Sequence, residues 1–341
     1  MYPFNLDSYY KEFVRVAQED EALAAQAEAQ GNKTLAFQYY LRAANLYGDQ
    51  NTLAYLSEHD PRMMPTYQKL VENFNKAWKL MTPPFESVEI PYGGSTLDAQ
   101  FYPTKVSPGQ RAPVVFSYGG ADSNLLGGSA NAGAPYTSSG ISYFNVDGPG
   151  MGGSLRLKKL YAPPDAERWV APVVDYLVSR PDVDPDRIGI TSASMGGYGA
   201  PRAMTADKRF AAGAVWAGTF DLQRDIFDYY PPIQDKLRWL IGAKTLEEAR
   251  NLMGEFTLRG RVQNIEAPLL IGYSTDDRVM NPGGARELHD KAVNARSVAL
   301  LPGAGHNFES PPPPLPPSYN TPAVNRTTAF VDFFAKQFGL A

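Results

Sequence analysis

Residues 188–199 read IGITSASMGGYG, and this segment indicates the fold more clearly than any other part of the chain. A run of β-branched residues gives way to small residues around Ser194, and a helix-compatible segment follows. This pattern is typical of a nucleophile elbow, in which a tight strand-to-helix turn exposes a serine hydroxyl at the carboxyl edge of a sheet. The turn needs small neighbours, and Ser192 and Gly196 supply them, although glycine is usual at both positions. The alternative is an ordinary glycine-rich turn, because short motifs of this kind recur by chance.

Three histidines are candidates for the base that activates this serine. A serine is a good nucleophile only when a histidine takes its proton and a carboxylate orients that histidine. His59 lies in a polar stretch and His289 in a charged helical pattern, so both are expected at the surface. His306 follows a short apolar strand and lies in a loop of small residues, where a base must sit to reach the elbow. We therefore predict that His306 is the general base.

Two adjacent aspartates, Asp276 and Asp277, compete for the role of the acid that orients the histidine. They follow residues 267–273, which read as a buried parallel strand. The chain order in α/β-hydrolases is serine, then aspartate or glutamate, then histidine, and both aspartates satisfy it. The residue before an Arg-Val pair usually carries the acid, which favours Asp277 and leaves Asp276 to cap the turn. The alternatives are Asp276 as the acid, or two loop caps with no further role.

The oxyanion that forms during attack needs two backbone N–H donors. One normally comes from the residue after the nucleophile, which is Met195 here. The other comes from the loop after an early strand, and residues 112–118 read as that strand. The glycines that follow allow the backbone to turn its N–H groups inward. Gly120 or Ala121 is expected to supply the second donor, and the sequence does not choose between them.

Four segments occur together in order, namely GGADS at 119–123, DGPGMG at 147–152, SMGGYGA at 194–200 and DKRFAAGAVWAG at 207–218. With these segments the chain resembles the FrsA-like α/β-hydrolases, the group that includes 2,6-dihydroxypseudooxynicotine hydrolase and fungal polyketide-shortening hydrolases. The resemblance covers roughly residues 85–338, and DGPGMG is its most specific element. It implies a Ser-Asp-His triad and substrates that are often 1,3-dicarbonyl or polyketide-like, with cleavage of C–C as well as ester bonds.

The composition argues against several classes of function. The 341 residues carry 32 basic and 36 acidic side chains, a net charge of −4 without a basic run, so nucleic acid and anionic membranes are not expected partners. The absence of cysteine excludes disulfides and cysteine catalysis. Scattered histidines leave little to build a metal site, and neither a metal nor a cofactor is expected. With no signal peptide or membrane span expected, we predict a cytoplasmic protein that acts on a small molecule, with a homodimer as a candidate state.

The hydrophobic periodicity changes once, near residue 83. Residues 1–82 read as helices and resemble the helical lid of the FrsA-like group. The expected helices cover residues 10–30, 33–47 and 66–81. In residues 83–341, strands and helices alternate after an initial hairpin, which predicts an α/β-hydrolase fold with a mostly parallel sheet and helices on both faces. Residues 221–260 are expected to form a helical, cap-like insertion. The proline-rich run at 311–317 is expected to form a stiff polyproline II strut.

Three hypotheses for function follow. In the first, Ser194, Asp277 and His306 form a triad that cleaves an ester or a 1,3-dicarbonyl C–C bond in a bulky polyketide-like or aromatic small molecule. In the second, the same residues act as a lyase that eliminates an acyl group, such as acetate, from an acylated natural-product intermediate, and a site that excludes water would favour this. In the third, the chain is a non-catalytic binder, because a fold does not fix a function.

Overall fold

A computed structural model describes residues 5–48, 51–126, 133–306 and 326–340 of the chain. Contacts between residues divide it into a smaller unit, Met1–Glu86 with Asp122–Ala132, and a larger unit, Ser87–Ala121 with Gly133–Ala341. The proline-rich run at 311–317 lies outside the described residues.

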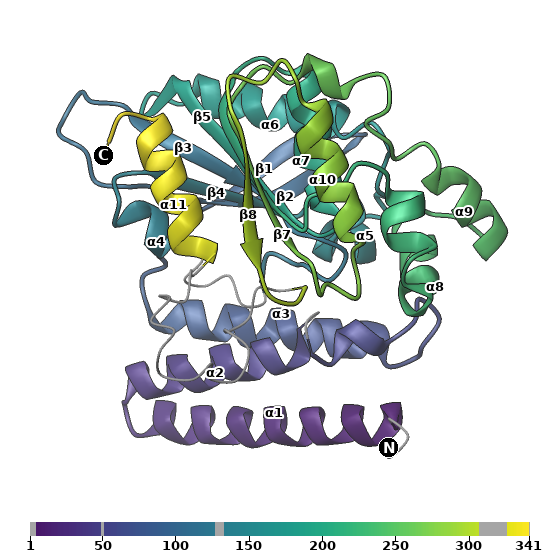
Figure 1. The fold of residues 1–341 in the computed structure, drawn as a ribbon. Helices are drawn as coiled ribbons and strands as arrows, with labels where there is room; N and C mark the ends of the chain where they lie inside the picture. The colour runs from purple at the N-terminus through teal and green to yellow at the C-terminus, as the bar shows by residue number, and fades with distance from the viewer. Residues whose placement is uncertain (1–4, 49–50, 127–132, 307–325, 341) are drawn as a thin grey trace, which may run out of the picture. The chain divides into compact units, whose positions relative to one another are not determined.

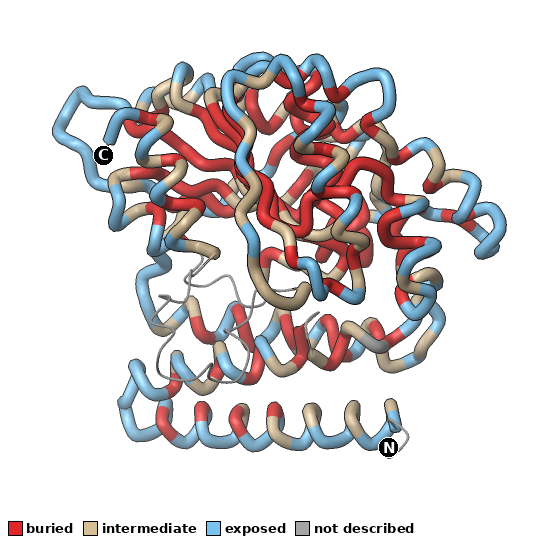
Figure 2. The backbone as a smooth tube through the Cα atoms, in the orientation of Figure 1, coloured by how far each residue is buried: buried red, intermediate tan, exposed pale blue. Residues whose placement is uncertain are grey.

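The described residues of the larger unit form an eight-stranded sheet with the strand order β1-β2-β4-β3-β5-β6-β7-β8 (Figure 1). The strands are β1 (Glu86–Tyr92), β2 (Ser95–Tyr102), β3 (Ala112–Ser117), β4 (Ser142–Val146), β5 (Val183–Ala193), β6 (Phe210–Trp216), β7 (Leu269–Ser274) and β8 (Val298–Gly303). β2 pairs antiparallel with β4, whereas the six strands from β4 to β8 pair in parallel. β3, β6 and β7 are buried along almost their whole length (Figure 2), as expected for a parallel sheet covered on both faces.

Helices cover both faces of this sheet. The helices of this unit are α4 (Ala134–Thr137), α5 (Gly152–Arg156), α6 (Glu167–Ser179), α7 (Gly196–Ala206), α8 (Gln234–Leu240), α9 (Leu246–Met253), α10 (Pro282–Lys291) and α11 (Arg326–Gln337). Gly189 of β5 pairs with Ala212 of β6, so the next residue, Gly213, faces the other side. A Cβ atom at Gly189 would lie 2.6 Å from the Phe334 ring of α11, whereas one at Gly213 would overlap Met204 of α7. α7 and α11 therefore lie on opposite faces, which confirms the predicted fold class.

The chain between β6 and β7 is mainly helical, in the region where the sequence predicts an insertion. Besides α8 and α9, it contains the π-helical turn η3 (Gln223–Phe227) and the 3₁₀ turns η4 (Pro231–Ile233) and η5 (Val262–Asn264). α8 and α9 pack against each other, and η3 contacts α9, η4 and α10. This segment therefore lies beside the loop that follows β7.

The smaller unit contains α1 (Leu6–Ala29), α2 (Lys33–Tyr47), the 3₁₀ turn η1 (Leu53–Tyr55) and α3 (Met63–Leu80), and α2 packs against both α1 and α3. Asn5 caps α1 by accepting the N–H of Ser8 at 3.0 Å, so the helix begins four residues before its expected start at residue 10. α2 has the expected bounds, whereas α3 begins three residues early. The core cluster between these helices consists of Ala24, Ala27, Ala36, Tyr40 and Ala77.

Candidate active site

Ser194 lies on a tight turn between the last residue of β5, Ala193, and the first residue of α7, Gly196. Its φ of +57° is in the left-handed region, which costs an L-amino acid roughly 1–2 kcal/mol. The Ser194 N–H donates to the Trp216 carbonyl at the end of β6 over 3.0 Å, which holds the turn in this conformation. The turn has the geometry of a nucleophile elbow.

Ser192 occupies the position at which this motif usually has glycine. Its Oγ donates a hydrogen bond to the Tyr118 carbonyl, 2.8 Å away, just beyond the end of β3. A Cβ atom at Gly196 would overlap the Ser192 hydroxyl and would lie 2.8 Å from the Gly119 carbonyl oxygen. The space of the missing Gly196 side chain is thus filled by Ser192, which joins the elbow to the loop after β3.

His306 bridges the serine and one aspartate. Its Nε2 lies 3.0 Å from Ser194 Oγ, and its Nδ1 lies 2.9 Å from Asp277 Oδ2. The Asp277 side chain is only 3% exposed, and its other oxygen, Oδ1, accepts the N–H groups of Val279 at 2.8 Å and Met280 at 2.9 Å. The residues selected from the sequence therefore form one hydrogen-bonded chain, arranged as in a Ser-His-Asp triad.

Asp276 has a different set of partners. Its Oδ1 accepts hydrogen bonds from the Ser274 hydroxyl and from the Gly305 N–H, which lies 2.9 Å away. These hydrogen bonds, with that from Ser274 the larger effect, hold the pKa of Asp276 below its usual range. The structure places Asp277 against the imidazole of His306. Asp276 instead binds the backbone N–H of Gly305, the residue just before His306.

Gly120 packs directly against Ser194. A Cβ atom there would lie 2.8 Å from Ser194 Cβ and 2.9 Å from the Ala193 carbonyl oxygen, so only glycine fits. Ala121 and Met195 are each 6% exposed. In the described residues, the N–H groups of Gly120, Ala121 and Met195 donate to no acceptor. Buried donors are normally paired, so these N–H groups are suited to bind an oxyanion.

Trp216 contacts the loop that carries His306, and the sequence contains no signal for this contact. Its indole Nε1 donates a hydrogen bond to the His306 carbonyl, and its side chain is almost fully buried. The two residues are 90 positions apart, so no local pattern could indicate the contact. A Cβ atom at Gly272 of β7 would overlap the Trp216 ring, which explains the glycine there.

The DGPGMG loop after β4 has a clear structural role. Asp147 is 4% exposed, and its Oδ2 accepts the N–H of Gly153 at 2.9 Å, in the first turn of α5. Its carbonyl accepts the hydroxyl of Ser154 at 2.6 Å. A carboxylate at a helix N-terminus satisfies free N–H groups and is favoured by the helix dipole. The motif therefore starts α5 by the chemistry of a helix cap.

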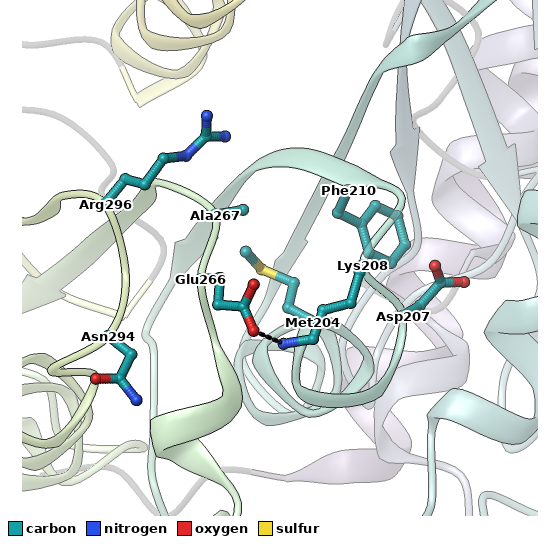
Figure 3. A pocket seen from close by; sticks show the side chains of 8 residues that line it. All are labelled: Met204, Asp207, Lys208, Phe210, Glu266, Ala267, Asn294 and Arg296. Carbon is teal, nitrogen blue, oxygen red and sulfur yellow. Dashed lines mark hydrogen bonds and ion pairs between the residues drawn. The ribbon is translucent and has the colours of Figure 1, made fainter.

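One pocket is lined by none of these residues (Figure 3). It measures about 450 Å³ and is lined by Met204, Asp207, Lys208, Phe210, Glu266, Ala267, Asn294 and Arg296. It lies near the amino-terminal ends of β6 and β7, whereas Ser194 lies at a carboxyl end, where open α/β sheets bind ligands. Its lining is charged, and Lys208 pairs with Glu266 at 2.7 Å. Another cavity, which Met195 helps to line, measures about 30 Å³, room for few water molecules.

The sheet order, the elbow and the hydrogen-bonded serine, histidine and aspartate define an α/β-hydrolase. Residues 168–340 match the prolyl oligopeptidase family, and the chain belongs to this family. The family and the relatives below identify the protein as a hydrolase, which confirms the predicted enzyme class.

Curated relatives extend the match beyond the family region. Hydrolase LUC6 of Fusarium sp is 30% identical over 317 residues, covering 81% of this chain and 75% of that protein. The 20-hydroxy-prefusarin hydrolase FUS2 of Gibberella moniliformis is 29% identical, with the same coverage. Alpha/beta hydrolase psoB of Aspergillus fumigatus is also 29% identical, and the match covers 89% of this chain and 72% of psoB.

The crystal structure of 2,6-dihydroxy-pseudo-oxynicotine hydrolase has a similar fold. It superposes with a TM-score of 0.76 at 21% sequence identity and covers 96% of this chain and 87% of that chain. The resemblance noted from the sequence is therefore confirmed for the fold, and the FrsA-like label stays a prediction.

The described residues contain no helix that is long and apolar enough to span a membrane. They also contain no group of three or more histidine, aspartate or glutamate side chains arranged to hold a metal ion.

Proposed function

We propose that the protein hydrolyses an ester or a 1,3-dicarbonyl C–C bond in a bulky polyketide-like or aromatic small molecule. The observation that carries the proposal is the chain of contacts from Asp277 through His306 to Ser194, at 2.9 Å and 3.0 Å, beside N–H groups that find no acceptor among the described residues. The distances are those required of a nucleophile, its base and the group that orients the base.

The reaction has two halves. Ser194 Oγ attacks the carbonyl carbon while His306 Nε2 takes its proton, and the carbonyl electrons move to the oxygen. The N–H groups of Met195 and of Gly120 or Ala121 hold this oxyanion. Collapse expels the alcohol, or the enolate when a C–C bond breaks, and the leaving group takes the proton from His306. Water then gives His306 a proton, attacks the acyl-enzyme and releases the acid, and Ser194 recovers its proton.

Two names among the similar proteins support a small-molecule substrate. One relative is named for hydrolysis of 20-hydroxy-prefusarin, and the similar fold is that of a 2,6-dihydroxy-pseudo-oxynicotine hydrolase. The resemblance of the sequence to polyketide-shortening hydrolases supports the same class. We also propose that residues 1–82 act as a lid and 221–260 as a cap, and that the protein is a cytoplasmic homodimer. These four statements rest on the sequence, and light scattering would test the dimer.

Two histidines offer a matched test. We expect His306→Gln to lower the turnover of p-nitrophenyl acetate by about a thousandfold or more, because the serine loses its base. His289→Gln removes a half-exposed histidine that contacts Asp290, and it should leave turnover unchanged. Full turnover by His306→Gln would contradict the proposal.

Oxygen-18 water distinguishes hydrolysis from acyl elimination. The probe is the acetate ester of a β-hydroxy ketone, with Ser194→Ala measuring the uncatalysed background. Hydrolysis puts one label into the released acetate and leaves the hydroxy ketone. Elimination by C–O cleavage releases unlabelled acetate and an enone. We expect labelled acetate, whereas unlabelled acetate with enone would replace the hydrolase proposal by the lyase.

A further inference from the structure

The loop that carries Asp277 is held by the π-helical turn η3 and the residues just after it. We propose that Asp225 and Tyr229 are positioning residues, which fix the orientation of Asp277 toward His306. This proposal rests on the proposed function. π-Helical turns are rare and are often found at functional sites. Here the turn contacts one end of the segment 277–281 through Asp225, and Tyr229, just after the turn, contacts the other end.

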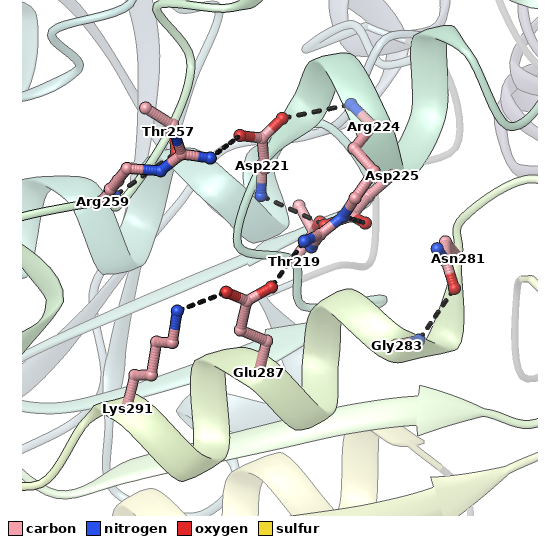
Figure 4. Close-up of polar contacts among 10 residues, drawn as sticks. All are labelled: Thr219, Asp221, Arg224, Asp225, Thr257, Arg259, Asn281, Gly283, Glu287 and Lys291. Carbon is pink, nitrogen blue, oxygen red and sulfur yellow. Dashed lines mark hydrogen bonds and ion pairs between the residues drawn. The ribbon is translucent and has the colours of Figure 1, made fainter.

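The first contact depends on a buried carboxylate that the proposed mechanism does not use (Figure 4). Asp225 is 0% exposed, and its Oδ2 accepts the hydroxyl of Thr219 at 2.6 Å and the N–H of Asp221 at 3.1 Å. The Arg224 guanidinium donates to both of its oxygens, at 2.7 Å and 2.9 Å. A buried charge is tolerated only with such partners, and these partners hold the turn in one geometry.

From this fixed position, the Asp225 carbonyl accepts the N–H of Asn281 at 2.8 Å. Asn281 is also the N-cap of α10, because its side chain accepts the N–H of Gly283 at 2.9 Å (Figure 4). A Cβ atom at Gly284 would overlap the Asp225 carboxylate and would lie 2.7 Å from the Thr219 hydroxyl. The start of α10 is therefore packed directly on the buried carboxylate.

An ion-pair network secures α10 to the same turn (Figure 4). Glu287 of α10 lies 2.6 Å from both Arg224 and Lys291. Burial opposes ionisation of Glu287, but the hydrogen bonds from Lys291 and Arg224 outweigh it and lower the pKa. Glu287 is therefore charged at neutral pH, and Arg224 bridges the helix to Asp225.

The second contact lies at the other end of the segment. The Tyr229 hydroxyl donates to the Asp277 carbonyl at 3.0 Å. Within the segment, Asp277 Oδ1 accepts the N–H groups of Val279 and Met280, so Oδ2 is the oxygen left for His306. Tyr229 and Asp225, which lie outside the segment 277–281, hold the backbone of this segment in place. The position of that backbone sets the direction of Oδ2.

The kinetic test compares two neighbouring tyrosines. Tyr229→Phe removes one hydroxyl and keeps the ring, and we expect kcat for p-nitrophenyl acetate to fall about 3- to 10-fold with KM unchanged within about twofold. Tyr230→Phe is the matched control, because the hydroxyl of Tyr230 makes no hydrogen bond within the described residues. Asp225→Asn should lower kcat at least about tenfold, because an amide nitrogen cannot accept the hydrogen bonds that Arg224 and Thr219 donate to the buried carboxylate.

A spectroscopic readout separates positioning from a general loss of stability. The chain has three histidines, so ¹⁵N-histidine labelling with a His306→Gln reference assigns the Nδ1–H proton that lies between His306 and Asp277. We expect this resonance to shift in folded Tyr229→Phe and Asp225→Asn and to stay unchanged in Tyr230→Phe. Wild-type kcat and an unshifted resonance in Tyr229→Phe would overturn the proposal, and so would an equal loss in Tyr230→Phe.

The test still applies when one variant does not fold or when the ester is not a substrate. If Asp225→Asn does not fold, Tyr229→Phe carries the test alone. If the wild-type protein does not turn over the ester, the proposed function is in question, but the resonance still reports whether Tyr229 positions Asp277.

Discussion

Ser192 joins the strand-to-helix turn that carries Ser194 to the loop after β3. It does so through one hydrogen bond, from its Oγ to the Tyr118 carbonyl at 2.8 Å. We expect Ser192→Gly to lower the free energy of unfolding by about 1–2 kcal/mol, because the hydrogen bond is lost and the unfolded backbone gains freedom. Thermal denaturation measures this change. Ser192→Ala is the matched control, since it removes the hydroxyl and keeps Cβ, and it should cost less than Ser192→Gly. A Tm at or above the wild-type value in both variants would contradict this role.

Gly120 leaves no room for a side chain beside Ser194. Gly120→Ala places a methyl group 2.8 Å from Ser194 Cβ and 2.9 Å from a carbonyl oxygen, so the loop with the proposed oxyanion donors must move. We expect phosphonate labelling of Ser194 to slow by about a hundredfold. Gly254→Ala is the control, because its nearest contact is 3.2 Å, at the Asn251 carbonyl. Equal labelling rates in the two variants would exclude the steric explanation.

Asp276 couples stability to pH. Its pKa is lowered by the hydrogen bonds from Ser274 and Gly305, so the folded state favours the ionised form. The resulting stability is complete above the usual carboxyl pKa of about 4 and is lost as the pH falls through the lowered pKa. We expect the Tm difference between wild type and Asp276→Asn to be largest at neutral pH and to shrink below about pH 4. A difference that is independent of pH would argue against this role.

The sequence predicts individual site residues where a local pattern and chain order agree. The elbow marks Ser194, elimination among three histidines marks His306, and their catalytic roles stay predictions. It could not choose firmly between Asp276 and Asp277, because both follow the same strand and only the turn geometry decides which carboxylate reaches the imidazole. It gave no indication of Trp216 as a partner of His306, since that contact joins distant positions.

At the level of elements, β6 and β7 approach each other closely, and this packing positions the loop that carries His306. Gly272→Ala would push a methyl group into the Trp216 ring, whose indole donates to the His306 carbonyl. Overpacking of this kind costs about 1–3 kcal/mol, and we expect slower phosphonate labelling as well. Trp216→Phe removes the indole N–H without a clash and should slow labelling by itself. Labelling at the wild-type rate in both variants would show that Trp216 does not position the loop that carries His306.

Long elements could be predicted better than short ones. α2 has the predicted bounds because its apolar residues repeat at helical spacing, whereas the start of α1 is set by the Asn5 cap, before the periodic pattern begins. The π-helical turn at Gln223–Phe227 has no sequence period of its own. It is held by the carboxylate of Asp225, whose partners become visible only in the folded structure.

For the whole molecule, the division into units places Ser194, Asp277 and His306 in the larger one. Ala36→Asp buries a carboxylate in the core of the smaller unit and should cost that unit about 3 kcal/mol or more. We expect helicity to fall while a small phosphonate still labels Ser194 within about threefold of the wild-type rate. Leu35→Asp, on the exposed side of the same helix, is the control. Labelling lost together with helicity would mean that the two units unfold as one.

The change in periodicity near residue 83 lies close to the boundary between the units, at 86 and 87. The assignment of Asp122–Ala132 to the smaller unit could not be predicted, because it depends on contacts across the chain and not on composition.

An activated serine is the central requirement of the proposed function. Intact mass spectrometry after treatment with a small fluorophosphonate, for wild type and Ser194→Ala, examines it without knowledge of the substrate. We predict one adduct on the wild-type chain and none on Ser194→Ala. No adduct on the wild-type chain, or an adduct that persists in Ser194→Ala, would contradict a nucleophilic Ser194.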